Sequence, residues 1–93
     1  MFVKLLQVDL LIPGCQSLKE KRFVLSSLKA RLRGRFNASV AEVDHQDKWQ
    51  RSVLAVAIVG SDHKVVDETC GSVRRFIEGD PRVTVTDAVE EFR

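Results

Sequence analysis

The stretch LIPGCQSLKEKR, residues Leu11–Arg22, joins the end of a strand to the start of a helix through a tight turn. Pro13 and Gly14 stop the strand, because proline cannot donate to a sheet and glycine favours turns. Ser17 and Glu20 have the spacing of a capping box. In this motif the Ser17 hydroxyl accepts a free N–H of the first helical turn, and the Glu20 carboxylate accepts the Ser17 amide. The stretch therefore predicts a strand, a turn and a capped helix in direct succession.

Hydrophobic periodicity predicts the elements on both sides of this stretch. Alternating apolar residues predict a strand over Phe2–Ile12, and leucines at helical spacing predict a helix that runs to about Arg35. The later elements are, in order, a strand at Asn37–Asp44, a polar connection at His45–Lys48, a strand at Trp49–Val59, a capped helix between Gly60-Ser61-Asp62 and Gly79-Asp80-Pro81, and a strand at Val83–Phe92.

The resulting order, β-α-β-β-α-β without a repeat or a linker, is the split βαβ pattern. It predicts one α+β domain over residues 1–93: a ferredoxin-like sandwich in which two helices cover one face of a four-stranded antiparallel sheet. The first and third strands should be central. The third strand is apolar on both faces, although a sheet that is covered on one side should have a polar outer face. We therefore expect the open face to be covered, most simply by a second copy of the chain.

The composition fits one small domain. Of the 93 residues, 44% are hydrophobic and 30% are charged, with a formal net charge of +2, which indicates a soluble folded protein rather than a disordered chain. The chain has no apolar run of membrane-spanning length and no signal-peptide pattern, so we expect a cytoplasmic protein. Cys15 and Cys70 lack metal-ligand spacing and should be reduced. Cys70 falls on an apolar helix face, whereas Cys15, in the turn, can be exposed.

A second block, AEVDHQDKWQR at Ala41–Arg51, gathers acidic, amide, histidine and tryptophan side chains in one short segment. Together with Leu11–Arg22 and the element order, it resembles the YlxP-like family, a group of small bacterial proteins of unassigned function, over nearly the whole chain. The resemblance implies a ferredoxin-like fold. Genes of that family often lie beside those for a translation initiation factor and a ribosome-binding factor, which implies a role linked to translation. No catalytic residues follow from the resemblance.

The first predicted helix is strongly basic, with seven cationic residues and one acid between residues 17 and 35. At about 100° per residue, Arg22, Lys29 and Arg33 align on a stripe away from the leucine face, with Lys19 nearby. Such a stripe can follow a phosphate backbone and release its counterions. The alternative is a solvated face, since the helix dipole favours cations near the C-terminus. The dipole disfavours Lys19, Lys21 and Arg22 in the first turns, so we predict nucleic-acid contact.

The segment Asp44–Arg51 admits three interpretations. His45 and the two neighbouring aspartates can form an acid–base or metal set, but a metal site normally needs three or four converging ligands. A turn in which these side chains cap backbone groups has no such requirement and is favoured. The third interpretation is a binding patch, because Trp49 and its cationic neighbours offer an aromatic plane suited to a nucleobase or a protein hot spot.

The sequence therefore predicts a non-catalytic accessory protein that binds RNA or the ribosome. Nucleic-acid contact is assigned to Lys19, Arg22, Lys29, Arg33, Lys48 and Arg51, and partner contact to His45 and Trp49. No catalytic residue, metal or cofactor is assigned. The expected partners are RNA or the ribosome and a second copy of the chain, with no membrane. Two alternatives stay open: a protein-interaction or structural dimer module that uses the Asp44–Arg51 hairpin, and a small-ligand-binding protein or enzyme that uses Asp44, His45 and Asp47.

Overall fold

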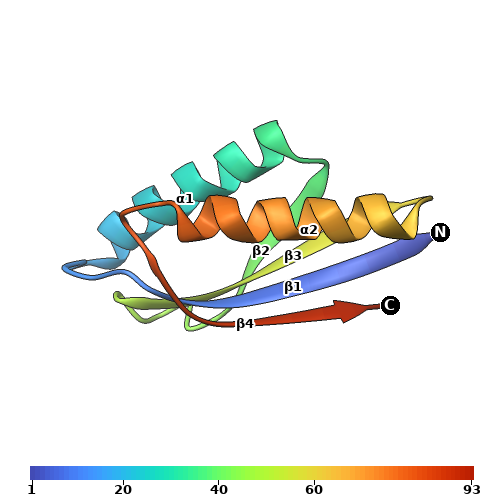
Figure 1. Ribbon diagram of the computed structural model, residues 1–93. Coiled ribbons are helices and arrows are strands. Elements are labelled where there is room, and N and C mark those ends of the chain that lie inside the picture. Colours follow the sequence, from blue (N-terminus) through green and yellow to red (C-terminus); the bar gives the residue numbers. More distant parts are fainter.

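The computed structural model describes residues 1–93 and contains the predicted elements in the predicted order. They are β1 (Phe2–Leu11), α1 (Leu18–Arg35), β2 (Ala38–Asp44), β3 (Arg51–Gly60), α2 (His63–Glu78) and β4 (Thr84–Phe92). The strands form one antiparallel sheet in the order β2-β3-β1-β4, so β1 and β3 are central, as predicted. Both helices lie on the same face of the sheet (Figure 1). The chain has a ferredoxin-like α+β fold.

The core fills the layer between the sheet and the helices. Alternate residues of the strands point into this layer and meet one stripe of each helix, which explains the two periods in the sequence. The buried apolar side chains include Leu6, Val8 and Leu10 of β1, Leu25, Leu28 and Leu32 of α1, Leu54, Val56 and Ile58 of β3, and Val66, Cys70, Val73 and Ile77 of α2. Neither helix combines the length and apolar composition that crossing a membrane requires.

The helix caps follow the sequence, with one change of partner. The Ser17 hydroxyl accepts the N–H of Glu20 at 3.1 Å, as the capping box predicts. The Glu20 carboxylate, however, accepts the N–H of Gln16 at 2.7 Å rather than that of Ser17. Asp62 caps α2 by accepting the N–H of Val65 at 3.1 Å. Both helix starts are therefore fixed by local side chains.

Two details refine the sequence prediction. β3 begins at Arg51 instead of Trp49, so residues 45–50 form the connection of the β2–β3 hairpin. Cys15 is buried, and its Sγ donates to the carbonyl of Ser17 at 3.3 Å. Cys70 is buried in the core, as predicted, and both thiols are free.

The second face of the sheet carries no helix (Figure 1). β3 is apolar on this face as well as on the covered one, and its neighbours add further apolar side chains. Those that are partly or fully exposed on the open face are Val3, Leu5, Leu11, Ala41, Val43, Ala55, Ala57, Val59 and Val89. Val53 differs from them, because only 4% of it is exposed.

Candidate nucleic-acid interface

The two sequence blocks dock on each other at one end of the molecule. The β1–α1 turn, the β2–β3 hairpin and the connection from α2 to β4 gather at this end (Figure 1). The side-chain amide of Gln50 donates to the carbonyl of Cys15 at 3.0 Å, and the Gln50 carbonyl accepts the N–H of Ile12 at 2.9 Å. The blocks Leu11–Arg22 and Ala41–Arg51 are therefore one structural unit, although they are far apart in the sequence.

Lys21 is the strongest link between the blocks. Its side chain reaches from α1 to the hairpin, where Nζ lies 2.8 Å from Glu42 Oε2 and donates to the carbonyl of His45 at 2.5 Å. Glu42 Oε2 also accepts the hydroxyl of Ser52 at 2.6 Å. Only 1% of Lys21 is exposed. This cation in the first turns of the helix is thus explained by a buried ion pair and does not belong to the basic surface.

His45 belongs to a turn rather than to a cluster of converging ligands. It is the non-glycine residue with a positive φ, 59°, and this conformation aims its carbonyl at Lys21. The Asp44 carboxylate accepts the N–H of His45 at 2.7 Å, whereas His45 Nδ1 lies 3.9 Å from the same oxygen. No three His, Cys, Asp or Glu side chains are arranged here to hold a metal ion. The geometry matches the capped-turn interpretation.

The outer face of α1 carries cations without acidic partners. Lys19 and Arg22 are exposed and Lys29 is half-buried, and none of the three forms an ion pair. Arg33 differs, because its guanidinium donates to the carbonyl of Val40 at 2.7 Å and so covers the free edge of β2. Of the predicted stripe, three cations are free and one is tied to the fold.

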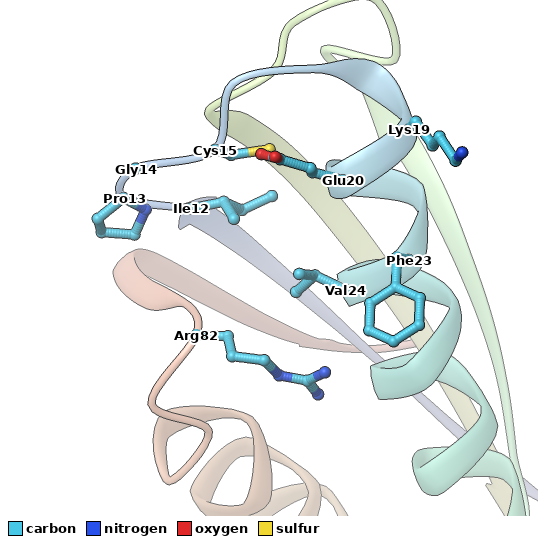
Figure 2. A pocket seen from close by; sticks show the side chains of 9 residues that line it. All are labelled: Ile12, Pro13, Gly14, Cys15, Lys19, Glu20, Phe23, Val24 and Arg82. Atoms are coloured by element: carbon cyan, nitrogen blue, oxygen red, sulfur yellow. The ribbon is translucent and has the colours of Figure 1, made fainter.

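An apolar cleft of about 510 Å³ lies beside this basic face. The β1–α1 turn forms one wall and the first turns of α1 form the other, with Arg82 between them (Figure 2). Phe23 lines the cleft and is 74% exposed, although it is a large aromatic residue. Phe23 was not among the residues predicted from the sequence. Its position two residues before Leu25, about 200° around a helix, places it opposite the leucine face, and this signal could have identified it.

The charged groups at the wall of the cleft are mostly neutralised. Arg82 forms a two-pronged pair with Asp80, with Nη2 at 2.8 Å from Oδ2 and Nε at 3.1 Å from Oδ1, and it also donates to Ser27. The hydrogen bonds from Arg82 hold the pKa of Asp80 below its ordinary value. Glu20 is engaged by the N–H of Gln16. The charges without a partner of opposite sign at this site are therefore the α1 cations and the Glu20 carboxylate.

The remaining predicted residues divide between two surfaces. Lys48 and Trp49 are exposed in the hairpin connection, and Trp49 is 52% exposed. Arg51 pairs with Leu11 in the β1–β3 register, and both side chains point to the open face of the sheet, away from α1. The structure thus brings Lys19 and Arg22, in the first turns of α1, to the end that holds the hairpin, whereas Lys29 and Arg33 lie further along the helix and Arg51 lies on the other face of the sheet.

A second charged cluster lies between β1, β4 and α2. Lys4 binds the carboxylate of Asp67 and lies 3.1 Å from Glu90, which also receives hydrogen bonds from Cys70 and Arg74. The hydrogen bond from Lys4 lowers the pKa of Asp67 and that of Glu90. Burial, and then the hydrogen bond to Glu90, raise the pKa of the Cys70 thiol to about 12, so it is a poor nucleophile. Every charge in this cluster has a partner.

Comparison with known proteins supplies a family but no activity. The family described as "Protein of unknown function (DUF503)" matches residues 3–89. The chain is also 34% identical over 80 residues to the uncharacterized protein YlxP of Bacillus subtilis (strain 168). The aligned region covers 86% of this chain and 87% of the relative. The family match spans both sequence blocks, both helices and all or most of each strand.

Proposed function

Because the chain belongs to the DUF503 family, whose description assigns no activity, we propose from its surface charges and exposed aromatic side chains that the protein is non-catalytic and cytoplasmic and binds RNA through the outer face of α1. The resemblance to YlxP-like proteins, with their genes beside translation genes, directs the proposal towards ribosomal RNA and a role in translation. The contacts are assigned to Lys19, Arg22 and Lys29.

One observation carries this proposal: Lys19, Arg22 and Lys29 of α1 lack acidic partners, whereas the cations that hold the fold together are paired. Lys4, Lys21, Arg74 and Arg82 each contact a carboxylate. Lys19, Arg22 and Lys29 contact none, although the chain holds 13 acids against 15 Lys and Arg. The helix dipole also opposes Lys19 and Arg22, which lie in the first turns of α1. Contact with RNA phosphates accounts for these three charges, which the fold does not need.

Phe23 supports a single-stranded ligand. An exposed aromatic ring beside cations offers a stacking plane for an unpaired base, worth about 1–3 kcal/mol per base. Phe23 lies one residue from Arg22 and lines the apolar cleft. Trp49, on the hairpin at the same end, is a second aromatic available for stacking. The central strands, by contrast, present no aromatic ring in the middle of the sheet, where the RNA-recognition module stacks its bases.

The salt dependence of RNA binding tests this proposal. The variant Lys19→Gln/Arg22→Gln/Lys29→Gln removes three charges without touching Arg33, whose hydrogen bond stabilises the edge of β2. Each lost phosphate contact should flatten the plot of log affinity against log salt by about 0.7 to 0.9. The matched control, Lys64→Gln/Arg75→Gln/Arg93→Gln, removes the same charge from other surfaces and should keep most of the slope. RNA and ribosome binding equal to wild type at every salt concentration would overturn the proposal.

The protein-interaction alternative rests on the exposed Trp49. If the α1 variant binds RNA and ribosomes as wild type does, the hairpin becomes the leading surface, since tryptophan is enriched at protein hot spots. Trp49→Ala should then abolish binding to one protein partner in a manner that salt hardly changes. Under the RNA proposal, the same substitution weakens RNA binding without changing the salt slope, because stacking releases few counterions.

A further inference from the structure

The open face of the sheet combines apolar side chains with an unusual arrangement of charge. Asp9 of β1 and Asp87 of β4 are direct cross-strand partners, so their side chains lie next to each other on this face. Like charges directly opposite each other destabilise a sheet. Neither carboxylate forms an ion pair with any cation of the chain. The isolated chain therefore leaves this repulsion uncompensated.

Arg51 is the complementary group on the same face. It pairs with Leu11 in the β1–β3 register, two residues along β1 from Asp9. Its guanidinium is exposed and has no carboxylate partner. Its position on the sheet face opposite α1 also separates it from the proposed RNA surface. One guanidinium has donors enough to bridge two adjacent carboxylates.

We propose that a second copy of this chain packs on the open face, with Arg51 of each copy bridging Asp9 and Asp87 of the other. In a two-fold dimer the same patch of each copy meets that of the other. The aspartate pair of each copy therefore faces Arg51 of the other, and the contact forms twice. The apolar side chains around them, among them Val59 at 53% and Val89 at 56% exposure, are covered by the same contact. The pairing removes the Asp9–Asp87 repulsion and the exposed apolar surface together.

The size of the face fits a specific but moderate interface. The four strands have seven to ten residues. At about 3.3 Å per residue, in four rows about 4.8 Å apart, they give a face of roughly 30 by 19 Å. Two such faces bury roughly 1,100 Å², slightly above the approximately 1,000 Å² that a specific interface needs. A dimer of this size should be visible at tens of micromolar protein, on the order of the affinities of moderate interfaces.

Sedimentation velocity with charge-swapped variants tests this proposal independently of RNA binding. Wild type should be dimeric at tens of micromolar, and Arg51→Glu should raise the dissociation constant by about tenfold or more, since it places three carboxylates together at each of the two sites. Adding Asp9→Arg to Arg51→Glu should restore much of the affinity, because opposite charges face each other again. Lys19→Glu, on α1, is the matched control and should leave the dimer unchanged. Circular dichroism verifies that every variant is folded.

Three outcomes would overturn the assignment. The first is a wild-type chain that stays monomeric at about 100 micromolar, a concentration above the expected range of tens of micromolar. The second is a dimer that Arg51→Glu leaves intact. The third is a dimer that EDTA dissociates, which would put a divalent cation between the aspartates in place of the guanidinium. Ala55→Lys provides a further check on the same face, whereas the buried Val53 is unsuitable because a lysine there would also disturb folding.

Discussion

Lys21 Nζ lies 2.8 Å from Glu42 Oε2, in a buried ion pair that fastens the first helix to the β2–β3 hairpin. The lysine side chain is 2% exposed and the glutamate side chain 18%. Such a pair costs desolvation when it forms, but removing one partner leaves the other charge buried and unpaired. The two most distinctive segments of the sequence are held together by this contact.

Lys21→Ala should therefore lower the free energy of unfolding by about 3 kcal/mol, near the low end for a broken buried pair, because Glu42 keeps its bond from Ser52 and some exposure. Urea unfolding at pH 7 measures the change. Lys19→Ala, two positions earlier and exposed, is the control and should stay within about 0.5 kcal/mol of wild type. Lys21→Met/Glu42→Gln removes both charges and should recover part of the loss. A Lys21→Ala variant as stable as the control would contradict the structural role.

The fold was predictable because its signals are local. Alternation in β1, the leucine stripe of α1 and the Ser17 cap each depend on residues within a few positions, and each is observed. The role of Lys21 was not predictable in the same way. The helix dipole marked it as a misplaced cation, but its partner Glu42 lies on a different strand, and only tertiary docking brings the two together.

The left-handed conformation of His45 leads to a second prediction. A non-glycine residue at a φ of 59° costs about 1 kcal/mol relative to glycine. His45→Gly should consequently be more stable than His45→Ala by about that amount, while both variants lose the same imidazole. The difference between the unfolding free energies of the two variants, measured in urea, gives the cost of the positive φ at residue 45. An alanine variant as stable as the glycine variant would mean that the turn relaxes to a negative φ.

Phe23→Ala should weaken RNA binding while leaving the stability of the fold nearly unchanged. At 74% exposure the ring adds little to folding, so the free energy of unfolding should change by less than about 0.5 kcal/mol. Loss of stacking should weaken binding to single-stranded RNA by about 1–3 kcal/mol with an unchanged salt slope. Fluorescence anisotropy at several salt concentrations measures both quantities. Val65→Ala, an exposed apolar residue on α2, is the control and should alter neither. Equal RNA affinity for Phe23→Ala and wild type would remove Phe23 from the site.

The candidate site was only partly predictable. Lys19, Arg22 and Lys29 could be grouped from helical spacing, and the structure presents them on one helix face. Arg51 could not be separated from Lys48 by sequence, since the direction of its side chain depends on where β3 begins and on its register with β1. The cleft beside Phe23 likewise joins three segments that meet only in the folded chain.

Cys70 should be almost unreactive in the native protein. Burial and the hydrogen bond to Glu90 raise the pKa of its thiol to about 12, so little thiolate exists at pH 8. In a Cys15→Ser variant, labelling of Cys70 by a disulfide reagent should follow global unfolding and accelerate as urea is added. The labelling rate of the urea-unfolded chain serves as the reference. Native labelling within tenfold of that reference would show that the α2–β4 contact opens easily.

Acid should weaken the fold through the cluster around Lys4. The hydrogen bond from Lys4 lowers the pKa of Asp67 below its ordinary value of 3.8 and that of Glu90 below 4.5. A group with a depressed pKa in the folded state stabilises the protein fully above its ordinary value, and this contribution is lost as pH falls through the folded pKa. The urea midpoint should therefore be flat near neutrality and fall below about pH 4.5.

Lys4→Met tests the source of this acid dependence. Without the ammonium group, the pKa values of Asp67 and Glu90 should rise, so the variant should be less stable at pH 7 and its stability should fall less steeply in acid. The Asp80–Arg82 pair is intact in the variant and should leave a residual slope, since Arg82 also lowers the pKa of Asp80. Arg22→Met removes a cation without acidic partners and should keep the wild-type profile. Urea midpoints measured from pH 7 to pH 2 compare the three proteins, and an unchanged acid slope in Lys4→Met would locate the sensitive carboxylates elsewhere.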